Sequence, residues 1–267
     1  MKTRIPNSNL IAVISLIAVV FAIGKFLFAA EQKQARVTEV FRDVKLLAAQ
    51  NAARAAAVNE TVHEGTAVRT GTESRAELTF PDQTLTRLGA NTVFSFGAGA
   101  RTYDLGNGAI LMTAPKSAGT IKITTAVSTC AVSGFTLIFE GHSNTWNKVL
   151  LGEGDGYVAL NRNPTDHRHI HSRQMLVFPF NATVLPQPIE FDVCGLIGGQ
   201  GLLINGFKQK LPSWPLLVSE CERQRSAPTT TKLVNPLSQD VIDQAMAAHP
   251  EMSAMPRPTI IPSSHHF

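Results

Sequence analysis

Three alternate histidines, His167, His169 and His171, are the residues whose types and spacing come nearest to a chemical site. Alternate side chains share one face of a β-strand, so three imidazoles could meet a divalent metal, as in open zinc sites. Histidines two apart on a strand lie roughly 7 Å apart, however, so three in a row reach too far to hold one ion on a straight strand. Residues 161–166 before them are typical of a loop or turn. The pattern therefore favours a solvated hairpin over its alternative, a metal-dependent enzyme that uses these histidines.

No other arrangement of residues predicts catalysis. The sequence contains no Gly-x-Ser-x-Gly, no His-Glu-x-x-His and no glycine-rich phosphate loop. Glycines cluster between Gly195 and Gly206 without the Gly-x-Gly-x-x-Gly spacing, which predicts tight turns between short strands rather than a nucleotide site. We therefore predict a protein that is not an enzyme and has no cofactor, with no catalytic, cofactor-binding or metal-binding residue.

The cysteines Cys130, Cys194 and Cys221 are odd in number, so one thiol stays free whatever the pairing. No Cys-x-x-Cys occurs, and the pattern favours small buried side chains. A bridge between Cys194 and Cys221 is the alternative, because both lie in the same C-terminal section and an exported chain permits disulfides.

The elements that must position these residues are predicted to be short strands. In residues 75–80 apolar and polar residues alternate, so Leu78 packs inward while Arg75, Glu77 and Thr79 meet water. Turn signals such as Pro81-Asp82 and Gly106-Asn107-Gly108 recur roughly every seven to eleven residues, which leaves no room for crossover helices. We predict an all-β fold of short antiparallel strands, in a β-solenoid-like roll or a two-layer sandwich.

Several short motifs follow one another at close spacing in this region: Arg69-Thr70-Gly71, Ser74-Arg75-Ala76-Glu77-Leu78, Phe80-Pro81-Asp82, Thr84, Arg87-Leu88-Gly89 and Asn91. Together they resemble the core motif of the FecR domain, a family named after the periplasmic iron-dicitrate sensor. Weaker matches include Leu151-Gly152-Glu153-Gly154, near the family's later glycine turn, and extend the resemblance over roughly residues 37–178. Gln83 and Phe135 replace a glycine and a threonine that are usual in the family, and neither removes a catalytic group.

This resemblance implies a non-enzymatic binding module in envelope sensing or signalling, which acts through protein or ligand contact at strand edges and loops. The expected partner is an envelope or extracellular protein or a surface polymer. In the family's sensors a cytoplasmic anti-sigma region precedes the membrane segment. Only nine residues precede Leu10 here, so we expect that region to be missing and direct control of a sigma factor not to carry over. A structural or adhesive surface protein is the alternative.

The first thirty residues are typical of an export signal. Lys2 and Arg4 precede an apolar run over residues 10–23, and Ala29 and Ala30 precede a polar stretch. This pattern predicts a cleaved signal peptide and a periplasmic or extracellular protein. Cleavage after Ala30 would place the bulky Phe28 at a position where a signal peptidase requires a small residue. Residues 10–30 could therefore remain uncleaved as an inner-membrane anchor, which would be the chain's only predicted contact with the membrane.

The charge balance argues against a nucleic-acid partner. The formal net charge is +4, but Lys2, Arg4 and Lys25 supply three of the 24 basic residues and the leader contains no acid. The remaining 21 basic and 20 acidic residues leave +1. No basic tract occurs elsewhere, so no nucleic acid is expected.

The chain is thus predicted to divide into four parts. A signal peptide or anchor (1–30) precedes a FecR-like β-domain (35–180), an apolar C-terminal extension packed on it (181–225) and a Pro-rich tail (226–267). Ser238 is predicted to cap a short helix in the tail, from Gln239 to Ala248. The Ala-rich residues 48–58 predict a short helical or irregular insertion.

Overall fold

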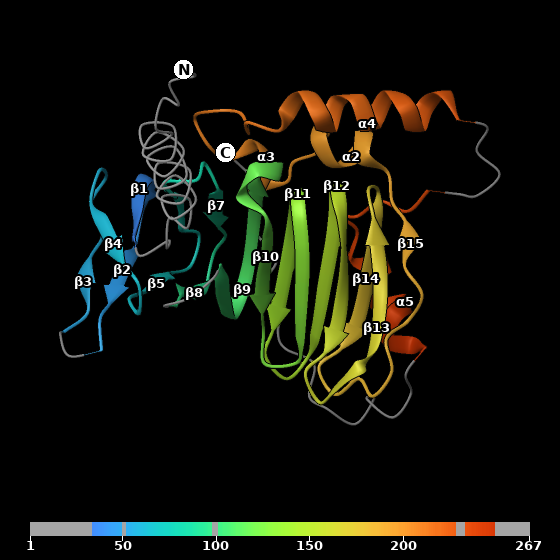
Figure 1. The fold of residues 1–267 in the computed structure, drawn as a ribbon, viewed down its shortest axis with the longest axis horizontal. Helices are drawn as coiled ribbons and strands as arrows, with labels where there is room; N and C mark the ends of the chain where they lie inside the picture. The colour runs from blue at the N-terminus through green and yellow to red at the C-terminus, as the bar shows by residue number, and fades with distance from the viewer. Residues whose placement is uncertain (1–33, 50–51, 98–100, 228–232, 249–267) are drawn as a thin grey trace, which may run out of the picture. The chain divides into compact units, whose positions relative to one another are not determined.

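The computed structural model describes residues 34–49, 52–97, 101–227 and 233–248 (Figure 1). The predicted leader and the end of the Pro-rich tail, residues 249–267, lie outside these ranges. Strands hold 49% of the described residues and helices 17%. The prediction of a mostly β fold is therefore confirmed. No helix within the described ranges is long and apolar enough to cross a membrane.

Fifteen strands form one mixed sheet that does not close on itself. The strands are β1 (Gln34–Phe41), β2 (Val44–Leu47), β3 (Arg54–Ala55), β4 (Thr61–His63), β5 (Ala67–Thr70), β6 (Arg75–Thr79), β7 (Leu85–Leu88), β8 (Val93–Phe96), β9 (Thr102–Ala114), β10 (Thr120–Thr124), β11 (Ser128–His142), β12 (Trp146–Leu160), β13 (Asn163–His171), β14 (Gln174–Pro179) and β15 (Ile189–Glu190). The helices are η1 (Lys116–Ala118), α2 (Val193–Gly198), α3 (Leu202–Asn205), α4 (Trp214–Ser226) and α5 (Gln239–Ala247).

The sheet branches at β9. The first half of this strand pairs with β8 and with β10, and its second half pairs with β7 and β11. One branch continues from β7 through β6 and β1 to β4, and another from β8 through β5 and β2 to β3. On the other side the sheet runs through β11 to β12, which pairs with both β13 and β14. Among the described strands the β9–β10 pair is parallel and the others are antiparallel.

The inner faces of these branches share one apolar core. Val37 on β1 and Val68 on β5 are both fully buried in it. The ring of Phe80 packs edge-on against Phe96 and Tyr103, with ring centroids 5.1 and 5.2 Å apart. The alternation seen in the sequence therefore marks side chains that meet in a single cluster.

Strands β9, β11 and β12 are 13, 15 and 15 residues long, so the expectation of short strands is wrong there. The turns expected at Gly106–Gly108 and Gly152–Gly154 are also wrong, because the chain continues in strand conformation through both. Gly108 and Gly154 instead have positive φ, 95° and 114°. A Cβ on Gly108 would lie 2.4 Å from Thr92 Oγ1, so glycine allows a close backbone approach within the sheet.

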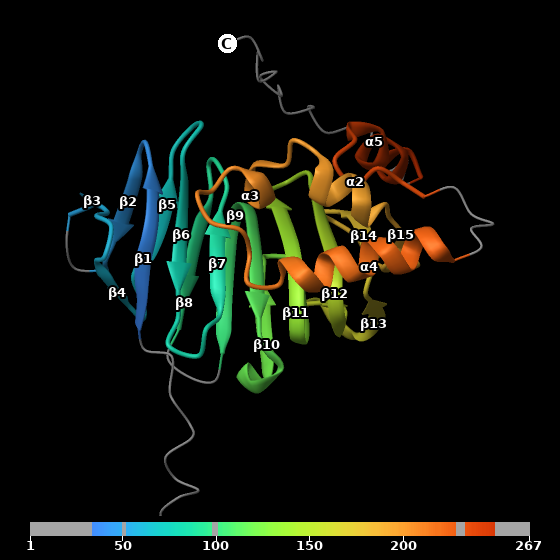
Figure 2. The ribbon, with the colours of Figure 1, turned by 90° about the horizontal axis from the view of Figure 1, so that it is seen from above.

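A second apolar cluster covers the outer face of the sheet. Leu111, Ile138 and Leu150 of the sheet pack in it with Leu196 of α2 and Leu217 of α4. Figure 2 shows α2, α3 and α4 crossing this face. We call the described residues from 191 to 247 the C-terminal cover.

Helices α2 and α3 replace the short strands and turns that the glycine cluster predicts between Gly195 and Gly206. The side chains of Val193 and Leu196 in α2, and of Ile204 in α3, are buried. This helical spacing places the apolar side chains on the sheet, which outweighs the glycines' preference for turns.

Helix α5 begins after Ser238, whose Oγ accepts a hydrogen bond from the backbone N–H of Asp240. Val241 and Ile242 are buried in the second cluster, whereas Leu237 is 42% exposed. In the Ala-rich segment, residues 52–58 contain the two-residue strand β3 and no helix.

Candidate binding surface

The three histidines lie on β13 with exposed side chains. The ring centroids are 6.0 Å apart between His167 and His169 and 6.4 Å apart between His169 and His171. His171 Nδ1 contacts the carboxylate of Asp155. No group of three or more histidines, cysteines or carboxylates in the described part of the chain could hold a metal ion. The positions of these histidines on β13 therefore lend no support to the alternative of a metal-dependent enzyme.

The loop predicted over residues 161–166 is shorter than expected. Residues 161–162 form the turn, and β13 already begins at Asn163. Pro164 lies within this strand, which pairs with β12 on one side and with no described strand on the other. An edge position tolerates a residue without an N–H, which explains why the strand extends through Pro164.

A polar cleft of about 560 Å³ lies beside the histidine row, between α4 and the sheet. The sheet is irregular beneath it: Gly134 and Gly154 have positive φ, and the non-glycine Arg173, at the break between β13 and β14, has a φ of 69°. Bulges and breaks of this kind often occur beside functional sites. The polar residues that line the cleft are Lys116, Ser133, Glu153, Asp155, Ser172, Ser219, Glu220 and Arg223.

Most acidic groups of the cleft have a basic partner. Glu220 is buried and accepts hydrogen bonds from Arg173 at 3.0 Å and Arg223 at 2.8 Å. Asp155 contacts His171. These pairs leave little free charge on the α4 side of the cleft.

Glu153 is different from the other carboxylates. It is half-buried, and Thr136 Oγ1 donates a hydrogen bond to its Oε2 at 3.4 Å. No ion pair to Glu153 occurs among the residues that the structure describes. Burial raises the pKa of Glu153, the hydrogen bond from Thr136 and the positive charge of Lys116 oppose this shift, and the negative charge of Glu220 adds to it. A desolvated carboxylate with one long hydrogen bond is a group that a cationic ligand would stabilise.

A buried arginine of the sheet, Arg87, forms an ion pair within the sheet and donates hydrogen bonds to the C-terminal cover. Arg87 is fully buried, and its Nε donates to Glu77 Oε2 at 2.9 Å. Its Nη1 donates to the carbonyl oxygen of Ile204 at 2.9 Å, and its Nη2 donates to that of Gln209. Burial lowers the pKa of Arg87, and the Glu77 carboxylate opposes this shift.

The prediction that Glu77 meets water is therefore wrong. Glu77 is only 7% exposed because α3 and the residues after it lie over the polar face of β6 and β7. A face that is polar in sequence is here covered by backbone carbonyls that accept its hydrogen bonds.

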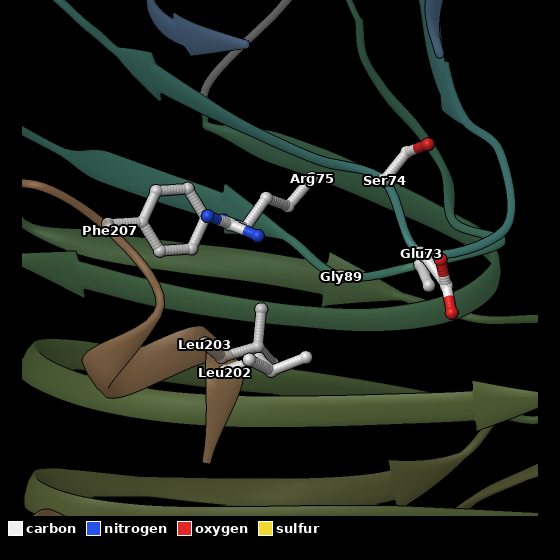
Figure 3. A pocket seen from close by; sticks show the side chains of 8 residues that line it. Glu73, Ser74, Arg75, Gly89, Leu202, Leu203 and Phe207 are labelled. Atoms are coloured by element: carbon white, nitrogen blue, oxygen red, sulfur yellow. The ribbon is translucent and has the colours of Figure 1, made fainter. Parts of the chain in front are cut away.

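A small pocket of about 40 Å³ remains at this contact (Figure 3). The Arg75 guanidinium lies 3.8 Å from the ring centroid of Phe41 and 5.7 Å from that of Phe207. Leu202 and Leu203 of α3 form another wall. A space of this size holds about one or two water molecules, so it is a packing gap and not a ligand site.

A disulfide joins Cys194 of α2 to Cys221 of α4. The alternative pairing is thus the correct one for these two residues, and the interpretation as free buried thiols is wrong for them. Cys130 is free and buried, as that interpretation predicts. Burial raises the pKa of the Cys130 thiol to about 12.

One part of the sheet matches a known protein family. Residues 66–154 match the family model of the FecR protein. The FecR resemblance predicted from the sequence is therefore confirmed for this region. The matched FecR domain runs from β5 into β12 and contains Glu77, Arg87, Lys116 and Glu153.

Two solved structures resemble half of the chain. Both are crystal structures of a "putative anti-sigma factor" from Parabacteroides distasonis ATCC 8503, with TM-scores of 0.43 and 0.42 and sequence identities of 13% and 14%. They cover 50% and 49% of this chain, and this chain spans 65% and 64% of theirs. No curated protein sequence matches the chain.

Sequence reasoning missed the cleft because its two sides are far apart along the chain. Lys116 and Glu153 belong to the FecR domain, whereas Glu220 and Arg223 belong to α4 in the C-terminal cover. One signal was visible in advance: Glu153 is a carboxylate between Gly152 and Gly154, and a glycine inside a strand often marks a bulge or a close approach by another segment.

Proposed function

We propose that this chain is an exported, non-enzymatic module that works in envelope sensing or signalling through protein or ligand contact. The match of residues 66–154 to the FecR family carries this proposal, because the sensors of that family are regulatory proteins rather than enzymes. The cleft between α4 and the sheet is lined by charged and hydroxyl groups, and its half-buried carboxylate, Glu153, has no ion pair among the described residues. Such a surface suits binding better than bond making.

The disulfide supports the exported location. Bridges such as Cys194–Cys221 form and persist in oxidising compartments and are rare in the cytosol. Together with the predicted leader, this favours a periplasmic or extracellular protein, with inner-membrane anchoring through residues 10–30 as the alternative. The histidine row and the cleft would then face the envelope or the medium.

The location is tested by fractionating cells that carry a C-terminally tagged copy and determining the mature N-terminus by mass spectrometry. We expect a product in the periplasm or medium that begins near Glu31. A membrane-bound product that keeps residues 10–30 would support the anchored form. A cytosolic product with free thiols at positions 194 and 221 would contradict the proposal.

The contact function is tested by capturing envelope proteins and surface polymers on the immobilised mature protein. The matched variants are His169→Asp, within the exposed histidine row, and His63→Asp, on the exposed strand β4 at the opposite end of the sheet. We expect a specific partner whose capture is weakened by His169→Asp and not by His63→Asp. Capture no greater than on bare resin would leave a structural or adhesive role as the better explanation.

A further inference from the structure

We infer that the cleft between α4 and the sheet is a binding site for a small zwitterion, whose ammonium group is held at Glu153 and whose carboxylate is held at Lys116. Free amino acids and short peptides with unblocked ends share this chemistry. The inference rests on the proposed sensing function and names the class of ligand that would be sensed.

Glu153 supplies the negative end of the site. Its half-buried carboxylate faces the cleft, and within the described chain its hydrogen bond is the one from Thr136 Oγ1 at 3.4 Å. Thr136 Oγ1 also lies 2.6 Å from Ser213 Oγ and 3.4 Å from Thr113 Oγ1, so this hydroxyl is shared among three acceptors. A primary ammonium group carries three N–H donors and would restore the hydrogen bonds that burial has removed from Glu153.

Lys116 supplies the positive end. It is exposed, lines the same cleft and forms no ion pair with any described residue. Its stem lies against Gly134, where a Cβ would come within 2.3 Å of Lys116 Cγ. Glycine at position 134 thus allows the lysine stem to lie close to the sheet, beside Glu153 on the neighbouring strand. Arg223 is a weaker candidate for the ligand carboxylate because it already pairs with Glu220.

The two opposite charges disfavour simpler ligands. Lys116 lies close enough to lower the pKa of Glu153, so an anion held at Lys116 would repel Glu153 and a diamine held at Glu153 would repel Lys116. A neutral sugar would displace water from both charges and supply an opposite charge to neither, which is costly for the half-buried carboxylate. One group of each sign satisfies both residues at once.

The size of the cleft agrees with this class of ligand. About 560 Å³ is within the usual range for small-molecule sites and is large enough for a few amino-acid residues. Ser133 and Ser219 offer hydroxyl groups along it, and Leu216, which is 51% exposed, offers an apolar surface at its edge. These groups suit a peptide backbone with small side chains.

The test is titration calorimetry of the mature protein with trialanine in four forms: both ends free, N-acetylated, C-amidated, and blocked at both ends. L-Alanine is titrated in parallel to distinguish an amino-acid site from a peptide site. We expect binding of the free form, and a loss of about tenfold or more for each blocked end, since a hydrogen bond to a charged group is typically that strong.

Two variants assign the ends. Glu153→Gln should remove the preference for a free N-terminus and keep the preference for a free C-terminus, and Lys116→Met should do the reverse. The controls are Glu190→Gln and Lys122→Met, which change exposed residues of β15 and β10 and should bind as the parent does. Thermal unfolding of each variant checks that it is folded.

The inference is overturned if neither free trialanine nor L-alanine binds, or if blocked and free forms bind equally. It is also overturned if both cleft variants keep the parent's preferences. These failures are separate from failure of the proposed function, because the capture experiment can still find a partner that depends on His169. A captured partner without zwitterion binding would remove the cleft ligand alone.

Discussion

Replacement of Arg87 by methionine should be the most destabilising single change among the polar residues of the sheet. Arg87 has no exposed side-chain surface, and Glu77 is only 10% exposed as a side chain. In the Arg87→Met variant the Glu77 carboxylate would keep the hydrogen bond from Thr38 Oγ1 at 2.8 Å and would lose its buried cation. The carbonyl oxygens of Leu203, Ile204 and Gln209 would lose their donors as well.

The expected size follows from these losses. Removing one partner of a buried ion pair typically costs about 3–5 kcal/mol. For a chain of this size each kcal/mol shifts the melting temperature by about 2–4 °C, so we expect a fall of about 6–20 °C. Because the lost carbonyl contacts belong to the residues around α3, amide exchange over residues 202–210 should accelerate more than exchange in β11.

The assay is thermal and urea unfolding followed by circular dichroism, with hydrogen exchange measured by mass spectrometry. Arg42→Met is the matched control: Arg42 pairs with Glu73, but the two side chains are 54% and 68% exposed. An exposed pair contributes about 0–1 kcal/mol. The double variant Glu77→Leu/Arg87→Met should recover part of the loss, since it leaves no buried charge. The reasoning is refuted if Arg87→Met costs no more than Arg42→Met.

Three further predictions concern the disulfide, the free thiol and a strand glycine. Reduction of the Cys194–Cys221 bridge, which spans 27 residues, should lower the free energy of unfolding by about 3.5 kcal/mol in urea titrations, and a Cys194→Ser/Cys221→Ser variant should show no response to reductant. Burial raises the pKa of Cys130 from 9.0 to about 12, so its stabilising effect is complete below pH 9 and is lost as the pH rises toward 12. Unfolding free energies of the parent and Cys130→Ala should therefore run nearly parallel up to about pH 8. From about pH 9 to 11 that of the parent should fall more steeply, by up to about 1.4 kcal/mol per pH unit, and parallel curves over this range would contradict this. Gly108→Ala should lower the free energy of unfolding by more than about 1 kcal/mol, because the φ of Gly108 is 95° and the new Cβ would meet Thr92. The control Gly198→Ala should be neutral or slightly stabilising, because no atom lies within 4 Å of its new Cβ. Equal effects of the two variants would contradict the close approach at Gly108.

The strands and their core could be predicted because they depend on local patterns. Alternation around Leu78 and Phe80 marks inward side chains directly, and the motifs from Arg69 to Asn91 are contiguous in the sequence. The prediction of turns failed at two glycines that are compatible with more than one backbone structure. Gly108 and Gly154 permit positive φ, which serves a turn or an irregularity inside a long strand equally well, and the pairing with distant strands decides between them.

The binding surface was harder to predict because it depends on contacts between distant segments. The sequence favours a solvated hairpin for the histidines, and they lie exposed on the edge strand β13, but Lys116 and Glu153 gain their role from α4, which lies far along the chain. Likewise, nothing local distinguishes Glu77 from a solvent-exposed glutamate. Its burial follows from the later residues that cover it.

The same polar face has a consequence for the order in which the protein forms. The C-terminal cover follows all fifteen strands along the chain, so a chain that emerges N-terminus first can form the sheet before its cover reaches it. Without the cover, the outer face would expose an apolar part that includes Leu111 and Ile138 and a polar part that holds Glu77 and Arg87. The polar part is less prone to associate with other chains than a continuous apolar face would be. The alternating pattern of residues 75–80 wrongly predicts an exposed Glu77 in the folded protein, but it describes the sheet correctly before the cover has packed. The ion pair thus serves as a solubilising group early in folding and as an internal contact afterwards.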